Sequence, residues 1–318
     1  MNRRTSACSN AYSRGLSLIE LMVSIAIGLI LMIAVMSAYI GSAGAGRVAE
    51  AQGRMNEDAQ AALTILSQQL RMAGNNPKQV NYEDAVARNP VYGAATYIVR
   101  GCDGTFSNVT TAANIPALTC AAGGTTADSI AISYEADVYN TVPTSGGLPT
   151  DCLGQALPII SNTLNVWDGT AAVPTAVTYS VADNRFYVAT STQNTSPTLY
   201  CKGSGNANAQ PLVENIENLQ LTYGTAPSTG ATMSVAGYLD AATILTDTGL
   251  AALASDPARW AKVMTVRICV VARSEQQVVA NAASAQYVSC DGNLITPPDQ
   301  RLRRAYSTTV VLRNRVAS

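Results

Sequence analysis

The sequence of 318 residues contains no histidine, and this absence removes several classes of function at once. Without histidine the chain has no imidazole to act as a general base, a metal ligand or a pH sensor near neutrality. It also lacks a C-x-x-C pair and a Gly-x4-Gly-Lys phosphate loop, which argues against a zinc site and against nucleotide hydrolysis. No pair of acids stands out as catalytic. We therefore expect no enzyme activity, no cofactor and no metal.

Charged residues are also scarce, at 13%, and phenylalanine and tryptophan number two each against 14 tyrosines. The formal net charge of −1 gives no reason to expect a nucleic-acid partner. Five arginines do gather near the C-terminus, but along strands they are expected to pair with acids or face solvent: Arg301, Arg303, Arg304, Arg313 and Arg315. Asp183-Asn184 and Asp291-Gly292-Asn293 lack the spacing of a calcium loop and are expected to be turns.

What the sequence does have is a long apolar run near its start. Leu16–Tyr39 spans 24 residues with one charge, Glu20, and the segment before it carries three arginines and no acid. As a helix this run would be about 36 Å long, enough to cross a hydrocarbon layer of roughly 30 Å. A cleaved secretory signal would have a shorter apolar stretch followed by a small-residue site. The arginines favour a cytoplasmic N-terminus, so we expect a single membrane pass and an exported body.

Glu20 is the unusual residue of this run. A carboxylate within a membrane helix costs a few kcal/mol on insertion scales. Because Glu20 lies near the start of the helix, its side chain can reach the headgroups by snorkelling. The alternative is that it pairs with a cation that becomes available when the chain is cut or assembled.

Residues 15–21, Gly-Leu-Ser-Leu-Ile-Glu-Leu, resemble the processing motif of type IV prepilins and pseudopilins. The resemblance implies that prepilin peptidase cuts after Gly15 on the cytoplasmic side and methylates the new N-terminus, Leu16. It also implies that Glu20 forms an ion pair with the α-amino group of Leu16 on a neighbouring subunit during assembly. Two compensating charges would set the register of an otherwise featureless apolar interface. Leu16 departs from the phenylalanine or methionine more usual there.

A second helical stretch follows the apolar run. Gly41, Gly44 and Gly46 interrupt its end, and we expect flexible or partly melted helix at this point. From Arg47 to Met72 the apolar residues recur three or four apart, which predicts an amphipathic helix that packs under the exported body. This apolar stripe consists of Val48, Met55, Ala59, Ala62, Leu63, Leu66 and Leu70. Gly74, followed by Asn75-Asn76-Pro77, indicates the end of the helix.

These boundaries divide the chain into four parts. They are a leader peptide over residues 1–15, the transmembrane half of a helix over 16–40, its amphipathic periplasmic half over 41–76 and a disulfide-bonded, β-rich head over 77–318. The fold class is α+β, with a long N-terminal helix packed on the head. That is the type IV pilin architecture, although the sequence leaves open whether the head is one body or two lobes.

Turn clusters separate short alternating stretches in the head. The pattern predicts strands at Ser129–Glu135, Leu219–Tyr223, Val263–Ala272, Ala285–Ser289 and Tyr306–Arg313. It also predicts a hairpin in which Ala176–Val181 and Arg185–Thr190 are joined by Ala182-Asp183-Asn184. Ala241–Ala254 is a further helical candidate, which Gly249 weakens.

Seven cysteines become six when the leader, with Cys8, is removed. An even number in an oxidising compartment indicates three disulfides, although six cysteines allow 15 pairings. Sequential pairing closes the shortest loops, and we expect Cys102–Cys120, Cys152–Cys201 and Cys269–Cys290.

Several segments of the body resemble the large minor pilins of the PilW type, namely residues 128–134, 151–154, 199–201, 213–224, 263–274 and 303–315. The paired cysteine segments of that family support the Cys152–Cys201 bridge. The resemblance implies a minor pilin that acts with other minor pilins and the major pilin in a priming or tip complex. Prepilin peptidase and the inner-membrane pilus assembly machinery are its implied partners. The implied location is the bacterial inner membrane, with the head in the periplasm, and then the pilus fibre at the cell surface.

Three alternatives are open. A J-type minor pseudopilin of type II secretion would be processed in the same way, but the long head and the cysteine segments favour the pilus protein. A membrane-anchored adhesin or binding module would not polymerise, and an anchored hydrolase is disfavoured because no catalytic site is assembled. The sequence does not distinguish motility, DNA uptake and adhesion as the use of the pilus.

Overall fold

The computed structural model describes residues 15, 17–78, 88–92, 95–122, 127–190, 195–206, 208–228 and 234–316. The chain divides into two compact units, Met1–Glu50 and Ala51–Ser318, and the boundary falls within a helix. The second unit holds both principal β-sheets and one hydrophobic core, so the head is a single body.

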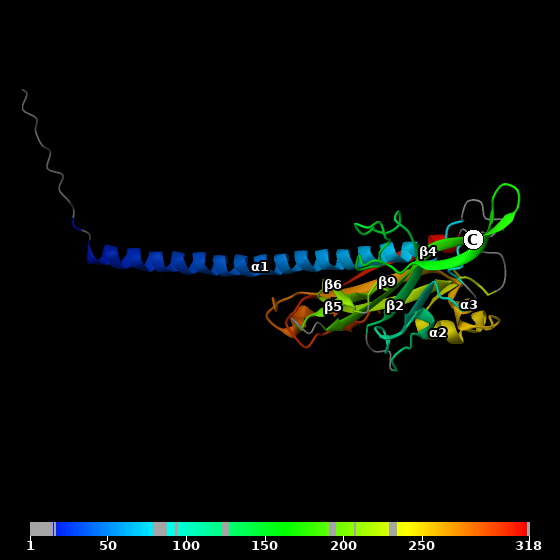
Figure 1. Cartoon of the computed structure of the whole chain (residues 1–318). Coiled ribbons are helices and arrows are strands. Elements are labelled where there is room, and N and C mark those ends of the chain that lie inside the picture. The colour runs from blue at the N-terminus through cyan, green and yellow to red at the C-terminus, as the bar shows by residue number, and fades with distance from the viewer. Residues whose placement is uncertain are drawn as a thin grey trace, which may run out of the picture. The chain divides into compact units, whose positions relative to one another are not determined.

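The helix α1 spans Leu18–Met72 and has 55 residues without a break (Figure 1). The expected melted segment at Gly41, Gly44 and Gly46 is therefore wrong, because all three glycines are helical. Each glycine costs about 1 kcal/mol relative to alanine, but interrupting the helix would also require a new, costly nucleus. Six of the seven residues of the apolar stripe are buried, and Val48 is half-buried.

The expected end of α1 is confirmed. Gly74 has a φ of 75°, a left-handed conformation that glycine adopts without a side-chain penalty. Its N–H donates to the carbonyl oxygen of Ser133 at 2.9 Å, and the N–H of Asn75 returns to Met72 at 2.9 Å. The helix thus ends where the carbonyl oxygen of Ser133, in a strand of the head, accepts the next backbone N–H.

The first sheet is antiparallel and has the order β1-β2-β4-β5-β6, with β3 paired to the first part of β4. Every residue of β2 is buried, as expected for a strand covered on both faces. The strands are β1 (Val99–Cys102), β2 (Ser129–Ala136), β3 (Ile160–Trp167), β4 (Ala172–Thr190), β5 (Pro197–Lys202) and β6 (Gln210–Glu214).

The second sheet is also antiparallel and has the order β12-β9-β7-β8, so β9 pairs with both β7 and β12. Its strands are β7 (Ile216–Thr225), β8 (Gly237–Leu239), β9 (Val263–Arg273) and β12 (Arg303–Val311). A small hairpin joins β10 (Tyr287–Val288) to β11 (Leu294–Ile295). Within it Gly292 has a φ of 80°, which confirms a turn at Asp291-Gly292-Asn293.

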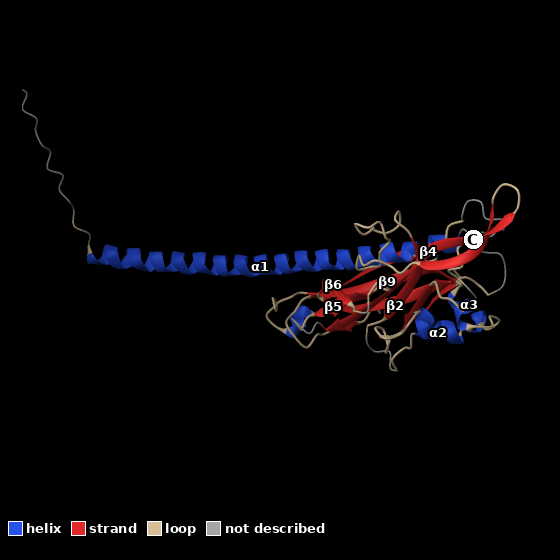
Figure 2. Ribbon diagram, viewed as in Figure 1, coloured by secondary structure: helices blue, strands red, loops and turns tan. Residues whose placement is uncertain are grey.

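Short helices complete the head, and α2 and α3 lie close together in Figure 2. They are η1 (Ile115–Ala117), α2 (Ala241–Thr246), η2 (Thr248–Leu250), α3 (Asp256–Trp260), η3 (Ala282–Ala285) and α4 (Arg313–Val316). The expected helix over Ala241–Ala254 is therefore broken after Thr246. Asp247 is the reason, since its side chain accepts the N–H of Leu250 and starts the separate turn η2.

The expected hairpin around Ala182-Asp183-Asn184 is wrong, because these residues lie inside the continuous strand β4. Asp183 and Asn184 favour turns when their side chains bond the local backbone. Here Asp183 instead binds Arg185, two residues along the strand, and the Asn184 side chain bonds to other elements. The expected strand at Ala285–Ser289 is also mostly wrong, since only Tyr287–Val288 is extended.

Two residues connect the sheets. Asn215 separates β6 from β7 and has a φ of 61°, so the chain passes from one sheet to the other at a left-handed residue. Asp128, just before β2, accepts the N–H of Leu221 in β7 at 2.7 Å and the N–H of Gly104 at 3.1 Å. One buried carboxylate therefore holds the start of β2 against the second sheet.

Candidate assembly site

Glu20 lies in the first turn of α1. Ser17 precedes the helix, and its backbone N–H donates to Glu20 Oε2 across 3.4 Å, as in a capping box. Gly15 is exposed, and Leu16 lies outside the described residues, as do Cys8 and the rest of the leader. The carboxylate is also exposed, so this single long hydrogen bond leaves it open to a stronger cationic partner.

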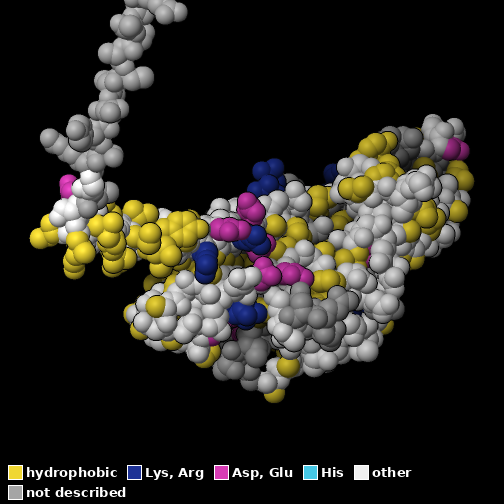
Figure 3. Space-filling view, turned by 90° about the vertical axis from the view of Figure 1, so that its left-hand side faces the viewer, with side chains coloured by type: hydrophobic (Ala, Val, Ile, Leu, Met, Phe, Trp, Pro, Cys, Tyr) yellow, Lys and Arg dark blue, Asp and Glu magenta, His cyan; other side chains and the backbone are white. Residues whose placement is uncertain are grey.

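The helix around Glu20 has an apolar surface. All the large apolar side chains from Leu18 to Ile40 are exposed, and Figure 3 shows hydrophobic side chains covering this stretch. Among the described residues, α1 is the one helix long and apolar enough to cross a membrane. Glu20 is the only ionisable side chain between Leu18 and Gly46 apart from Tyr39. A charge so isolated can distinguish one packing register from another.

The polar side chains of the same stretch satisfy themselves. The hydroxyls of Ser24, Ser37 and Ser42 donate to carbonyl oxygens of Glu20, Ile33 and Tyr39 at 2.7, 2.7 and 2.9 Å. A hydroxyl bonded to its own helix exposes no unpaired donor to lipid. Of the polar side chains on this surface, Glu20 is therefore the one whose hydrogen-bonding groups the helix satisfies least.

The other end of α1 is fixed to the head by a buried polar cluster. Gln69 Oε1 accepts hydrogen bonds from Asn184 Nδ2 at 2.8 Å and from the Tyr134 hydroxyl at 3.3 Å. Asn184 is fully buried, and its Oδ1 accepts the N–H of Cys152 at 3.1 Å. Burial is the main cause that raises the pKa of Tyr134, so its hydroxyl stays protonated at neutral pH. The cluster joins α1, β2 and β4 in one orientation.

Asn314 closes the last turn of the helix. Its Nδ2 lies 3.3 Å from the carbonyl oxygens of Arg71 and Met72 and 3.2 Å from that of Ala73. The last carbonyls of a helix have no partner within it, so a donor at this place satisfies groups that would otherwise need water. The C-terminal residues of the chain thereby hold the end of its first helix.

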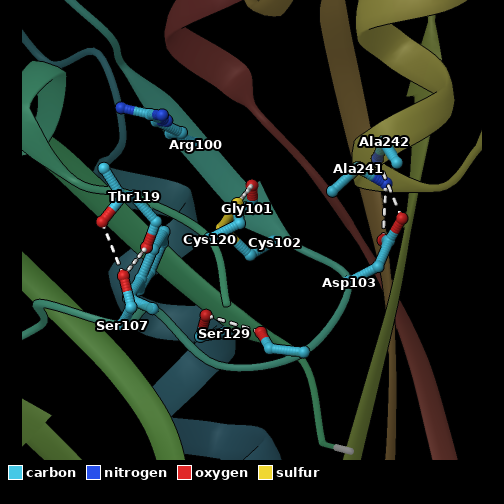
Figure 4. Close-up of a disulfide and its surroundings, with 12 residues drawn as sticks. Arg100, Gly101, Cys102, Asp103, Ser107, Thr119, Cys120, Ser129, Ala241 and Ala242 are labelled. Carbon is cyan, nitrogen blue, oxygen red and sulfur yellow. Dashed lines mark hydrogen bonds between the residues drawn. A yellow bond between two sulfur atoms is a disulfide. The ribbon is translucent and has the colours of Figure 1, made fainter. Parts of the chain in front are cut away.

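Three disulfides brace the head, and they pair the cysteines in sequential order. Cys102 joins Cys120, Cys152 joins Cys201, and Cys269 joins Cys290. Figure 4 shows the first of these beside Asp103, whose two carboxylate oxygens accept the N–H groups of Ala241 and Ala242 at 2.8 Å each. The bridge and the capped start of α2 therefore lie at the same end of β1. Among the described residues, no cluster of acids and cysteines could hold a metal ion.

Two of the C-terminal arginines, Arg301 and Arg303, pair with acids. Arg303 is buried and bonds Glu217 at 2.9 Å and Asp299 at 2.6 Å, while Arg301 lies 3.6 Å from Asp299. The hydrogen bond from Arg303 is the main cause that lowers the pKa of Asp299. Burial lowers the pKa of Arg303, but the bonds to both acids outweigh burial and raise it. The pairs serve the head, and Arg304 lies over the ring of Tyr306.

Arg185 shows the same principle in the first sheet. Its guanidinium is almost fully buried, pairs with Asp183 at 2.7 Å and donates to the carbonyl oxygens of Val109 and Ala112 at 2.8 and 2.9 Å. A forked donor with this many partners can be buried without an unpaired charge. Arg185 therefore holds the loop before η1 against β4.

Two family models match the chain. Residues 185–314 match type IV pilus-assembly protein W, and residues 10–36 match the prokaryotic N-terminal methylation motif. Over these residues the chain is similar to the PilW-type minor pilins. The first match begins at Arg185 and ends at Asn314, so it includes the buried arginine of β4 and the residue that closes α1. The second match covers Gly15, Leu16 and Glu20, which are the residues expected to be processed and assembled.

The comparison with solved structures finds a weak similarity. A type IV-like pilin from Thermus thermophilus is 10% identical to this chain, with 82% of this chain and 98% of the other covered and a TM-score of 0.34. No curated protein matches the chain. The families indicate a membrane-anchored structural protein rather than an enzyme.

Reasoning from the sequence missed the polar residues that fix the helix to the head. Gln69 lies among apolar stripe positions, and Asn184 was expected in a turn. Asn314 lies in a segment that resembles the family, and this was a signal of its importance. No pattern in the sequence, however, connects Asn314 with its partners Arg71, Met72 and Ala73, which precede it by 241 to 243 positions.

Proposed function

We propose that this chain is made as a precursor, cut between Gly15 and Leu16 by prepilin peptidase and methylated at the amino group of Leu16. Residues 16–40 would then hold it in the inner membrane with the N-terminus cytoplasmic, while the head over 77–318 stands in the periplasm. The isolated carboxylate of Glu20 on the apolar surface of α1 carries the proposal. Pairing with the new α-amino group of a neighbouring subunit would neutralise both charges within the bilayer.

The head would act as an assembly surface. It contacts other minor pilins and the major pilin in a priming or tip complex that starts the fibre, and it then lies at the fibre tip. The inner-membrane assembly machinery supplies the energy, because the sequence holds no phosphate-binding loop for nucleotide hydrolysis. Two features support this role: the three disulfides brace the head, and the buried polar cluster at Gln69 fixes the head to the helix that a fibre would pull on.

Mass analysis of the N-terminus tests the processing step. Protein is purified from membranes and from sheared pili, digested, and its first peptide is sequenced by mass spectrometry. We expect the mature chain to begin with methylated Leu16 in both fractions. An intact Met1 terminus in both would contradict processing and favour an anchored binding module that does not polymerise.

Substitution of Glu20 tests the assembly step separately. Glu20→Gln keeps the shape of the side chain and removes its charge, and we expect roughly tenfold or greater loss of incorporation into fibres, since breaking a buried ion pair costs several kcal/mol. Glu57→Gln is the matched control, because Glu57 is an exposed glutamate farther along the same helix. Cleavage is measured in both. Equal fibre incorporation by the two variants would exclude the pairing role of Glu20.

A further inference from the structure

One part of the head has no packing partner among the described residues. β3 pairs residue by residue with Ala172–Tyr179, whereas β2 pairs with β4 only from Ser180 onward. We call β3 and residues 172–179 the arm, and Figure 1 shows it extending beyond the other strands of the head. Two-stranded ribbons are marginally stable in water without a third strand or a packed face. A third strand paired with the arm would therefore stabilise it.

The two faces of the arm differ in character. Side chains alternate between faces along each strand, so one face is mainly apolar and includes only Asn162 and Thr175 as polar residues. Its apolar residues are Ile160, Leu164, Val166, Val173, Val177 and Tyr179. None of the six is buried. The opposite face carries Ser161, Thr163 and Asn165, with Trp167 near the turn. Asp168, in the turn itself, is the one charged residue between 159 and 179.

The two edges of the arm also differ. The N–H of Asp168 donates to the carbonyl oxygen of Ala171 at 3.1 Å, and this bond closes the hairpin. Because hydrogen-bonded pairs alternate along an antiparallel ladder, the backbone groups of β3 that face away from β4 belong to odd-numbered residues. Consistent with this, the N–H of Thr163 bonds the neighbouring side chain of Asn162 at 2.8 Å rather than β4.

On β4 the outward backbone groups belong to even-numbered residues, among them Pro174. Proline has no N–H and blocks the addition of a strand, which is a common protection of sheet edges. The outer edge of β3 has no proline and no charge from Ile160 to Trp167. One edge of the arm is thus closed to a further strand, and the other is open.

We propose that the open edge of β3 pairs with β3 of a second copy of this chain. A strand laid against β3 should carry no charge, since a charge there would lose water without gaining a partner. Three of the outer strands of the two sheets include charged residues, namely Arg100 in β1, Glu214 in β6 and two arginines in β12, and the fourth, β8, is uncharged but only three residues long. β3 itself is uncharged and eight residues long.

The register of this pairing follows from its symmetry. A twofold axis through Thr163 places Ile160 of one copy opposite Val166 of the other on the apolar face, and Ser161 opposite Asn165 on the polar face. The outward N–H and C=O groups of Ser161, Thr163 and Asn165 then pair across the axis, and the N–H of Thr163 exchanges its bond to the Asn162 side chain for one to the other copy. Asp168 remains outside the contact. The two arms become one four-stranded sheet whose mainly apolar face has Asn162 of each copy opposite Leu164 of the other.

Cysteine crosslinking tests the contact in the full-length chain, purified in detergent and carrying Cys8→Ser. Thr163→Cys places a thiol at the twofold axis, and we expect crosslinked dimer with a short bismaleimide. Thr178→Cys is the control, since it lies on the same polar face but at the edge that Pro174 closes. Association through the membrane helix would affect both variants equally. Equal crosslinking of the two would overturn the proposal.

Proline substitution tests the edge itself. Thr163→Pro removes an outward N–H that β4 does not use, and Ala176→Pro is the same change on the other edge of the same rung. We expect Thr163→Pro to weaken dimerisation by about tenfold or more, because two hydrogen bonds are lost across the axis, and Ala176→Pro to leave it unchanged. Sedimentation equilibrium in density-matched detergent measures the constant, and the disulfide map confirms folding. Equal dimerisation of both variants, or crosslinks in cells only to other pilins, would refute this occupant while leaving the processing result intact.

Discussion

The side-chain amide of Asn184 donates a hydrogen bond of 2.8 Å to Gln69, 115 residues away, and so joins the longest strand of the head to α1. We expect Asn184→Leu to lower the free energy of unfolding by roughly 3 kcal/mol, because Gln69 Oε1 loses its shorter bond and the N–H of Cys152 loses its acceptor. Urea unfolding followed by circular dichroism measures the change. Gln69→Leu in the same background completes a double-mutant cycle. A coupling energy near zero would show that the two amides act independently.

A second prediction concerns the last turn of α1. We expect Asn314→Ala to lower the free energy of unfolding by about 1 kcal/mol, because the carbonyl oxygens of Arg71, Met72 and Ala73 lose their donor. Amide hydrogen exchange should rise at the end of the helix and not in β2. Asn293→Ala, in the exposed turn after β10, is the control. The prediction fails if both variants change exchange in the same places.

Asp128 gives the head a dependence on pH. Burial raises the pKa of its carboxyl from 3.8 to about 7, although the two backbone N–H bonds oppose this change, and Asp103 and Asp240 add to it. The folded chain therefore holds a proton that the unfolded chain releases, and stability should fall as pH rises from about 4 to about 7. The fall should amount to a few kcal/mol, since each pKa unit corresponds to about 1.4 kcal/mol.

Asp128→Asn removes this titration. Unfolding in urea at intervals from pH 4 to pH 8 should show a smaller fall for the variant than for the unmodified chain. The variant is compared with the unmodified chain because other groups titrate as well. Burial also raises the pKa of Glu135, while Arg303 lowers that of Asp299, so their contributions to the slope have opposite signs. Parallel curves for the two proteins would contradict the assignment to Asp128.

The three disulfides should differ in what they contribute. Cys152–Cys201 encloses 49 residues, against 21 for Cys269–Cys290 and 18 for Cys102–Cys120. In the chain-entropy account, paired serine substitutions should cost about 4 kcal/mol for the longest loop and about 3 kcal/mol for the shortest. Thermal unfolding of the three double variants gives the order. A non-reducing peptide map checks the pairing, and free thiols at Cys152 and Cys201 would contradict it.

The sequence was most informative where local rules decide the outcome. The spacing of Met55, Ala59, Ala62, Leu66 and Leu70 predicts the buried stripe of α1 because the side-chain period of a helix is fixed. Gly74 predicts its end because few other residues tolerate the left-handed conformation. The long α-helix and the β-rich head followed from these signals, and the structure has both.

The errors arose where distant contacts outweigh local preference. Ala182-Asp183-Asn184 reads as a turn until Arg185, Gln69 and Tyr134 provide partners for its side chains, and these lie up to 115 residues away. The strands β1, β3, β5, β6, β8 and β11 were not predicted. β3 alternates, but its apolar residues face solvent, and β5 begins with Pro197. At the candidate assembly site, the motif predicted Glu20. The hydrogen bond from the N–H of Ser17 to its carboxylate is visible only in the structure.

The donor that closes α1 comes from Asn314, which lies 242 residues after Met72. The junction between the helix and the head therefore closes a loop that contains both sheets, including β12, which pairs with Thr265–Arg273 of β9. A contact between residues so far apart in the sequence costs loop-closure entropy before it contributes any stability. We therefore expect this junction to form late in folding, after the sheets that it encloses.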